Sequence, residues 1–371
     1  MQDARILKLA QNLVQFSTKV QAGDKVLIQS QNGNQDLVQA LVREVYRAGG
    51  VPFVWMLDTR VERALLMECT REQLELRAQA DGLLMDKMDC YIGMTGIVNR
   101  AETSDVPAER QALYNHYYAE AVHDRIRIPK TRWVVLRYPT PAMAQMAGMS
   151  TEAFEDFYFD VCNMDYSKME RAMLPLQEWM GRTDKVHIVG KGTDLTFSIR
   201  DIPAILCAGT MNIPDGEVYT APVRESVNGV IQYNTPSTMD GFTFENVRLR
   251  FENGKIVDVQ ANDSQRARKI FEQDEGASYV GEFAIGVNPY ITKAMNNILF
   301  DEKIAGSFHF TPGACYDECS NGNKSALHWD LVCIQTPEYG GGEIYFDDVL
   351  VRKDGRFVPE ALWALNPENL L

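Results

Sequence analysis

The first half of the chain alternates between short apolar runs and segments with helical periodicity. Helical spacing recurs over residues 1–16, 35–48, 60–80, 107–122 and 150–180, and the apolar runs between them read KVLIQS, VPFVWML, CYIGM and WVVLRY. Strands that alternate with helices of this length build βαβ units and a mainly parallel sheet. The run VPFVWML is apolar throughout, which predicts a strand buried on both faces. We therefore predict an α/β N-terminal domain over residues 1–182.

The helical segments carry boundary signals of their own. Gly49 and Gly50 follow the segment 35–48 and predict its end. Ser150 precedes the segment 150–180 and is a candidate N-cap, with Glu152 in the first turn.

The second half of the chain has a different texture. Residues 185–199, 247–261 and 343–358 alternate apolar and polar side chains across turn residues, and two of these turns are Asn253-Gly254 and Asp354-Gly355. Such patterns are typical of β-hairpins. Helical spacing is confined chiefly to residues 263–274. We therefore predict a β-rich α+β C-terminal catalytic domain over residues 183–371.

Composition excludes several classes of function. The formal net charge is −14, which argues against a nucleic-acid partner, because phosphate binding needs a basic surface. No apolar stretch approaches the ~20 residues that span a membrane, and the amphipathic N-terminus is unlike a signal peptide. No glycine-rich dinucleotide or P-loop motif is present. Seven cysteines, an odd number without a CxxC pair, favour a reduced, cytoplasmic protein.

Histidines are scarce, and one of them stands two residues before an aspartate. The chain has five, of which His116, His123 and His187 are interpreted as structural or surface side chains. His328 stands two residues before Asp330, and these positions share one face if the segment is a strand. Together with His309 they supply the donors for one divalent metal ion. A buried His–Asp pair without metal explains the same pattern equally well.

Two glutamates open apolar strands in the same half of the chain. Glu217 follows Gly216 in IPDGEVYTAP, and Glu282 follows Gly281 in YVGEFAIGVNP. A carboxylate at the inner start of an apolar strand is costly to bury alone and far less costly beside a cation. Their presence together with His309, His328 and Asp330 favours a metal site.

The second half resembles the M29 family of metalloaminopeptidases, the aminopeptidase T-like enzymes. The stretches that carry the resemblance cover about residues 215–333 and read DGEVYTAP, SVNGVI, FENVRLRFENGKIVD, GEFAIGVN, NILFDEKIAGSFHFTPGACY and NKSALHWDLVC. Several such motifs in the right order are a specific match. The α/β first half also fits the family's layout.

The resemblance implies roles for six residues. The metal ligands fall on Glu217, Glu282, His309, His328 and Asp330, and a catalytic tyrosine falls on Tyr316. It also implies two divalent metal ions, zinc or alternatively cobalt or manganese, a peptide substrate with a free N-terminus, and a homodimer. The chain departs from the family wording HLALG-Y at Thr311 and Pro312, which puts substrate preference in question.

The chemistry of these residues fits hydrolysis of the first peptide bond. Five ligands exceed the needs of one tetrahedral metal with an open position, so the set suits two metals and a metal-activated water. Tyr316 would donate a hydrogen bond to the developing oxyanion, although a tyrosine that merely packs there fits equally well. Glu225 and Asp215 are both candidates for a general base, and the sequence does not choose between them. Asp301-Glu302 is interpreted as a polar turn.

Two other functions use parts of the same site. A mononuclear iron(II) dioxygenase needs only His309, His328 and Asp330, and ring-cleaving pyridine-diol dioxygenases resemble this fold while lacking the two glutamates. Retention of Glu217 and Glu282 argues against that reading. The second alternative is a non-catalytic relative that keeps the metal site for its structure.

Overall fold

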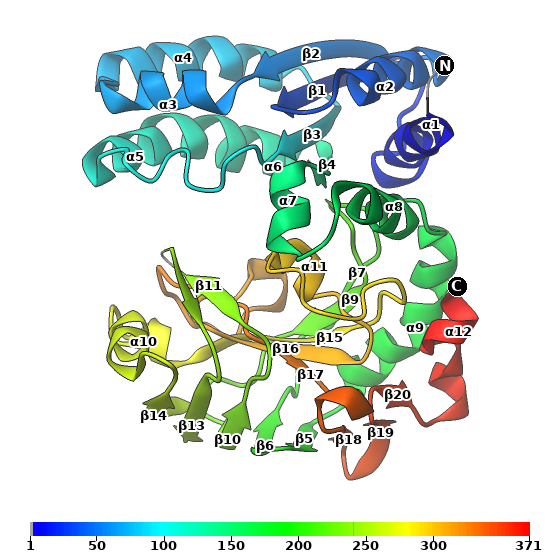
Figure 1. Ribbon diagram of the computed structural model, residues 1–371, viewed down its shortest axis with the longest axis vertical. Helices are drawn as coiled ribbons and strands as arrows, with labels where there is room; N and C mark the ends of the chain where they lie inside the picture. Colours follow the sequence, from blue (N-terminus) through cyan, green and yellow to red (C-terminus); the bar gives the residue numbers. More distant parts are fainter. Residues whose placement is uncertain (1–2, 240) are drawn as a thin grey trace. The chain divides into compact units, whose positions relative to one another are not determined.

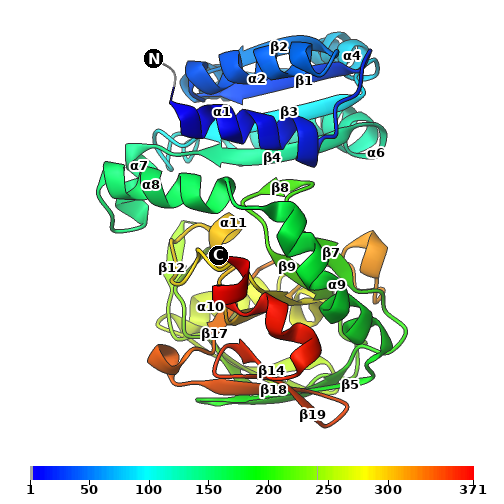
Figure 2. The same ribbon diagram turned by 90° about the vertical axis from the view of Figure 1, so that its right-hand side faces the viewer.

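The computed structural model describes residues 3–239 and 241–371 (Figures 1 and 2). These residues divide into two units. The first unit comprises Met1–Asn163 and Gly209–Ile213, and the second comprises Met164–Ala208 and Pro214–Leu371. Among the described residues, no helix combines the length and the apolar character needed to cross a membrane.

The first unit is built on a parallel sheet with strand order β2-β1-β3-β4-β8. Every neighbouring pair in it is parallel, which confirms the predicted α/β architecture. The strands are β1 (Lys25–Gln31), β2 (Val51–Leu57), β3 (Cys90–Gly96), β4 (Arg132–Tyr138) and β8 (Asn212–Ile213). Helices cover both faces of the sheet, with α1 and α2 on one side and α3 to α6 on the other (Figure 1).

The helical segments of the first unit begin and end close to the predicted positions. They are α1 (Ala4–Gln11), η1 (Asn12–Ser17), α2 (Gln35–Arg47), α3 (Thr59–Met67), α4 (Arg71–Met85), α5 (Ala108–Tyr114), η2 (Asn115–Arg127), α6 (Ile128–Lys130), α7 (Pro141–Met146) and α8 (Thr151–Cys162). Ser150 caps α8 by accepting from the Ala153 N–H, as predicted. The helical stretch predicted over residues 60–80 is divided into two helices, because Thr70 caps a new helix, α4, by accepting from the Gln73 N–H.

Strand β2 corrects one prediction. It forms the edge of the parallel sheet and is not buried on both faces. Phe53 and Trp55 pack against the core, whereas Val54 and Met56 are 40% and 51% exposed. Pro52 was the signal for an edge strand, because proline has no N–H to donate to a second neighbour.

The second unit contains two antiparallel sheets. One has the strand order β14-β13-β10-β6-β5-β18-β19-β20 and the other β17-β16-β15-β9-β7, while β11 (Ser237–Met239) pairs with β12 (Phe242–Phe244). The strands of the first sheet are β5 (Lys185–Gly190), β6 (Thr193–Ser198), β10 (Asn228–Gln232), β13 (Arg248–Glu252), β14 (Lys255–Gln260), β18 (Gly342–Phe346), β19 (Val349–Lys353) and β20 (Arg356–Phe357). Those of the second are β7 (Ile205–Cys207), β9 (Glu217–Thr220), β15 (Val280–Gly286), β16 (Ser307–Pro312) and β17 (Val332–Ile334).

The hairpins predicted from the sequence are present in the first of these sheets. Strands β5 and β6 pair, as do β13 and β14, whose turn residues Asn253 and Gly254 both have positive φ. The stretch predicted as one hairpin at 343–358 is two hairpins, because Asp347-Asp348 turns β18 into β19 before Asp354-Gly355 turns β19 into β20. Helical segments are α9 (Tyr166–Arg182), α10 (Ser264–Phe271), η3 (Gly276–Ser278), α11 (Ile298–Asp301), η4 (Asp317–Cys319), η5 (Pro337–Tyr339), η6 (Glu360–Leu365) and α12 (Pro367–Leu370).

Aromatic side chains join the two sheets of the second unit. Phe197 of β6 lies 5.0 Å, centroid to centroid, from both Phe283 of β15 and Phe310 of β16. Phe251 of β13 lies 5.9 Å from Phe310. The buried rings therefore form the core between the sheets, and the next residue on each strand faces the opposite side.

The units divide the chain at other points than the predicted domains 1–182 and 183–371. Helix α9 belongs to the second unit, because its buried side chains, which include Met173 and Leu176, contact β7, β9 and η6. The chain returns to the first unit over Gly209–Ile213, where β8 pairs with β4. Neither feature has a local signal in the sequence.

Candidate metal centre

The polar side chains of the candidate site project from one face of β9, β15 and β16. His309 pairs across the strands with Ala284, and Thr311 pairs with Glu282. Glu217 opens β9 opposite Gly286. Alternate residues of β15 and β16 point into the aromatic core. Glu282, His309 and Thr311 therefore share the other face of these two strands. Gly286 admits the backbone of the next segment, because an added Cβ there would lie 2.6 Å from the Ile304 carbonyl oxygen.

Two glycines bring the segment that carries His328 and Asp330 close to this face. A Cβ added at Gly281 would lie 2.1 Å from the Ala314 carbonyl oxygen. A Cβ added at Gly313, whose φ is +113°, would lie 2.1 Å from the Leu327 carbonyl oxygen. At Gly281 only glycine tolerates the close contact. At Gly313 only glycine tolerates both the close contact and the positive φ.

The segment around His328 is extended but is not the strand that the sequence predicts. Gly313 and His328 form an isolated bridge, and β17 begins only at Val332. The left-handed backbone at Gly313 interrupts the pairing. His328 and Asp330 still lie on one side, with 3.2 Å between Nε2 and Oδ1. Trp329 points the other way and stacks on Phe271, with ring centroids 5.3 Å apart.

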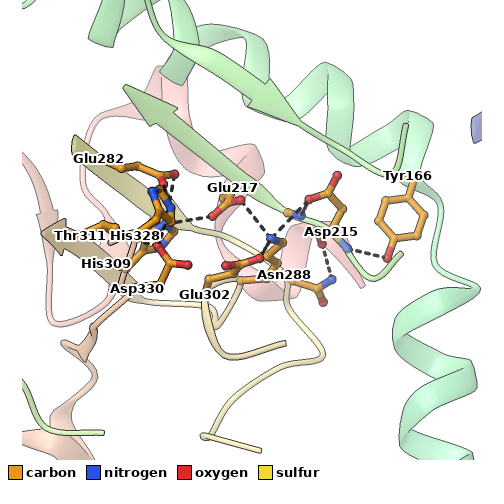
Figure 3. Close-up of polar contacts among 12 residues, drawn as sticks. Tyr166, Asp215, Glu217, Glu282, Asn288, Glu302, His309, Thr311, His328 and Asp330 are labelled. Atoms are coloured by element: carbon orange, nitrogen blue, oxygen red, sulfur yellow. Dashed lines mark hydrogen bonds and ion pairs between the residues drawn. The ribbon is translucent and has the colours of Figure 1, made fainter. Parts of the chain in front are cut away.

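Glu282 lies between the two imidazoles. Its Oε1 is 3.3 Å from His309 Nε2, and its Oε2 is 3.2 Å from His328 Nε2. Glu217 Oε2 lies 3.4 Å from the same nitrogen of His309. The five residues predicted as metal ligands therefore come together in the second unit (Figure 3).

The donor atoms form two groups that share Glu282. Glu217, Glu282 and His309 make the first, here called the Glu217 triad, and Glu282, His328 and Asp330 make the second, here called the Asp330 triad. Within each triad the candidate ligand atoms lie within 4.8 Å of one another. Glu217 Oε2 and His328 Nε2 are buried without a hydrogen-bond partner. Such atoms are costly unless a cation satisfies them, so the residues fit divalent metals.

The charges of the site shift the protonation of its members. Burial alone lowers the pKa of His309 and His328, but the carboxylates around them outweigh burial and raise the pKa to about 9 and about 11. Burial raises the pKa of Asp330, but His328 and then His309 lower it well below its usual value. The apo site therefore holds protons on imidazoles that a metal would displace.

Lys303 and Glu302 belong to the site, and the sequence analysis missed them. Lys303 is 1% exposed, and its Nζ lies 3.0 Å from Glu217 Oε1 and 3.9 Å from Asp215 Oδ1. It also contacts the Glu302 carboxylate directly. The triplet Asp301-Glu302-Lys303 carries no clear local signal, because charged residues are almost always exposed unless they are paired.

The prediction that Asp301-Glu302 is a polar turn is correct for Glu302, which stands in the turn after α11, but the pair is not solvated. Asp301 ends α11, is buried, and accepts from the backbone N–H groups of Met295 and Asn297. Burial raises the pKa of Asp301 to about 7. Glu302 follows it and faces Lys303 in the metal centre (Figure 3).

The structure separates the two candidates for a general base. Asp215 is 1% exposed and held beside Lys303, and its backbone N–H donates to the Tyr166 hydroxyl at 3.2 Å. The Glu225 side chain is 66% exposed and pairs with Arg224. Of the two, Asp215 lies in the site.

Tyr316 lies at the rim of the site. Its ring centroid is 4.9 Å from that of His328 and 5.5 Å from that of Tyr219, and the residue is 44% exposed. Burial of the ring and then the carboxylates, Glu282 first, raise the pKa of the phenol. The hydroxyl is therefore a protonated donor at neutral pH.

Thr311 is one of the two positions at which the chain departs from the family wording, and it contacts a predicted metal ligand. Its hydroxyl donates to Asp330 Oδ1 at 2.7 Å. This contact gives Thr311 a role beside a predicted metal ligand.

The remaining histidines make structural contacts. His123 lies edge-on to Tyr91 and Tyr118, and burial lowers its pKa to about 4. His116 pairs with Glu120 one helical turn away. His187 stacks on Tyr345.

The family model described as thermophilic metalloprotease (M29) matches residues 2–357. The chain therefore belongs to the thermophilic metalloprotease (M29) family.

Two proteins of similar sequence are aminopeptidases. The chain is 26% identical over 365 residues to aminopeptidase AmpS of Bacillus subtilis, covering 87% of each chain. It is 25% identical over 362 residues to aminopeptidase T of Thermus thermophilus, covering 86% of each.

Two solved structures share the fold. Wild-type AmpT from Thermus thermophilus superposes with a TM-score of 0.79 at 22% identity, covering 96% of this chain and 99% of that one. The 2,5-dihydroxypyridine dioxygenase of Pseudomonas putida KT2440 gives 0.63 at 14% identity, covering 96% and 98%. At these identities the likeness concerns the fold alone.

Proposed function

We propose that this protein is a metal-dependent aminopeptidase that removes N-terminal residues from peptides. The observation that carries the proposal is the pair of donor triads sharing Glu282, in a chain of a metalloprotease family whose named relatives are aminopeptidases. Glu217, Glu282, His309, His328 and Asp330 would hold the metal ions.

The charge of the site supports more than one divalent metal ion. The carboxylates of Asp215, Glu217, Glu282 and Asp330 surround the Lys303 ammonium and the two imidazoles, and Glu302, whose pKa burial raises to about 8, is a fifth acidic group there. With the imidazoles neutral, as metal ligands are, four carboxylates face one ammonium, an excess that a single divalent ion does not neutralise. Buried charge of one sign needs a counter-charge, and divalent cations supply it.

The protein's own groups would then divide the work. Bound divalent metals supply an activated water and polarise the carbonyl of the scissile bond. Glu282 belongs to both triads and turns one carboxylate oxygen toward each imidazole, so it would connect them. Tyr316, which is partly exposed beside His328, would donate a hydrogen bond from its hydroxyl to the oxyanion.

The finer properties rest on the ligand types and the resemblance. Mixed imidazole and carboxylate donors suit zinc, with cobalt or manganese as substitutes. The described cysteines are all free, which fits a reducing cytoplasm. A homodimer is proposed from the resemblance alone.

The experiment compares peptides with free and blocked N-termini. Protein stripped with chelator and reloaded with zinc, cobalt or manganese should cleave leucine p-nitroanilide and short unblocked peptides. N-acetylated forms of the same peptides should stay intact. Equal cleavage of blocked peptides would exclude an aminopeptidase, and no cleavage with any metal would favour a non-catalytic relative.

The iron dioxygenase is the weaker alternative. None of the donor groups found among the described residues joins His309 to both His328 and Asp330. His309 lies instead beside Glu217 and Glu282. One tightly bound iron per chain, with no peptidase activity, would reverse this preference.

A further inference from the structure

We infer that the two donor triads form unequal metal sites, a tight one at the Asp330 triad and a weaker, exchangeable one at the Glu217 triad. The difference lies in Lys303, whose ammonium is held against Glu217. This inference rests on the proposed function in one respect, namely that both triads bind metal.

The ligands of the Asp330 triad are oriented by neighbouring groups. The Nδ1 of His328 lies 2.8 Å from the Ala314 carbonyl oxygen and donates to it, which leaves Nε2 as the ligand nitrogen. The Thr311 hydroxyl donates to Asp330 Oδ1 at 2.7 Å. Partners of this kind fix the tautomer and rotamer of a ligand and strengthen metal binding.

The Glu217 triad lacks this support. His309 Nδ1 is buried and has no hydrogen-bond partner among the described groups. Glu217 Oε1 accepts a hydrogen bond from the Lys303 ammonium at 3.0 Å, so only Oε2 faces the triad. Its carboxylate charge is therefore already shared with another cation.

Lys303 is held in place from its other side. Glu302 contacts its ammonium and Asp215 Oδ1 lies 3.9 Å away, so acidic groups hold the charge beside Glu217 from this side as well. Cys207, Asp215 and Glu217 form a third group of candidate donors, and the ammonium lies against two of its members. Lys303 thus takes the place of a further cation there and repels one at the Glu217 triad, with little screening because it is buried.

The test measures metal affinity directly. Metal-free protein is titrated with Zn²⁺ against a chromogenic chelator, and with Co²⁺ while its visible absorption is followed. The wild type should show two affinity classes. Glu217→Gln should abolish the weaker class and keep the tight one, whereas Asp330→Asn should abolish the tight one.

Two variants separate the charge of Lys303 from its bulk, and a third tests the hydrogen bond that supports Asp330. Lys303→Met should tighten the weaker site roughly 10- to 100-fold and leave the tight site unchanged. Lys303→Arg keeps the charge and should keep the difference between the sites. Thr311→Val should weaken the tight site by roughly tenfold or more. Thermal unfolding of each metal-free variant checks that it folds.

The outcomes also distinguish this inference from the proposed function. One affinity class in the wild type, or a weaker site that Lys303→Met leaves unchanged or loosens, would overturn the inference while leaving peptidase activity in place. A protein that binds no metal or only one would overturn the inference together with the dinuclear site. If Lys303→Met unfolds, Thr311→Val and Glu217→Gln still decide the assignment of the two classes.

Discussion

The two faces of strands β15 and β16 carry opposite kinds of side chain. Toward the other sheet they present Phe283, Phe308 and Phe310, which are fully buried among aromatic rings. On the other face, one residue away along the chain, they present Glu282 and His309. One pair of strands therefore anchors the hydrophobic core and also carries candidate metal ligands.

This division of labour has a physical reason. A cluster of carboxylates repels itself and does not hold its own geometry. Apolar burial on the reverse face fixes the backbone from which those carboxylates project. Substitutions on the two faces should therefore separate activity from stability.

The largest effect is expected on the polar face. His328→Ala or Asp330→Ala removes a ligand of the Asp330 triad, so activity should fall by roughly a thousandfold or more and metal should be lost. The free energy of unfolding of the metal-free protein should change less than in the core variant below. Assays of kcat/KM and of bound metal by mass spectrometry check this. Near-normal turnover in either variant would remove these residues from the site.

The next effect belongs to the aromatic face. Phe283→Ala leaves a cavity between the sheets and should cost about 3–5 kcal/mol of stability, measured by urea unfolding. The protein that remains folded should keep its metal affinity. Val349→Ala, at a half-exposed position of β19, is the matched control and should be nearly neutral. Loss of metal affinity at unchanged stability would contradict the separation of the faces.

Tyr316 tests the rim of the polar face. Tyr316→Phe keeps the ring against His328 and removes only the hydroxyl, so kcat should fall about 100-fold while metal content stays normal. Steady-state kinetics beside metal analysis give the answer. Unchanged kcat would show that the tyrosine only packs there.

Asp215 and Glu225 form a matched pair of acidic residues. Asp215→Asn alters the charge beside Lys303 and should lower activity by roughly tenfold. Glu225→Gln alters an exposed ion pair and should change activity and stability little. Equal effects in kcat/KM would show that burial beside Lys303 does not matter.

The smallest expected effect is a dependence of stability on pH in the metal-free protein. The folded pKa values of His309 and His328, about 9 and about 11, lie above the ordinary value of 6.5. Their contribution to stability is therefore complete below pH 6.5 and is lost as pH rises through the folded values. Thermal unfolding with chelator should show a falling Tm from pH 6.5 to 9. Metal-loaded protein should lose less thermal stability over this range, because its imidazoles are already neutral. Identical pH profiles of Tm with and without metal would contradict this account.

Local sequence patterns were sufficient to predict the parallel sheet, a hairpin and the candidate site residues. The alternation in the first half foretold the parallel sheet, and Asn253-Gly254 foretold a hairpin whose turn residues both have positive φ. The residue types and spacing at Glu217, Glu282 and His328 pointed to one site. Periodicity succeeds there because it reports which residues share a face of their own element.

Other features were decided by contacts between distant segments. The edge position of β2, the place of α9 in the second unit and the burial of Lys303 depend on which neighbours pack against them. A sequence window does not contain those neighbours.

The sequence by itself determined the α/β and β-rich halves and the five candidate ligands, because strand and helix periods and residue chemistry are local properties. The tertiary structure decided that Glu282 stands between two imidazoles and that Glu217 shares its charge with Lys303. Both depend on cross-strand register and on the close backbone approach at Gly281 and Gly313. The chain therefore specified the donors, and only the fold specified how they divide into two triads.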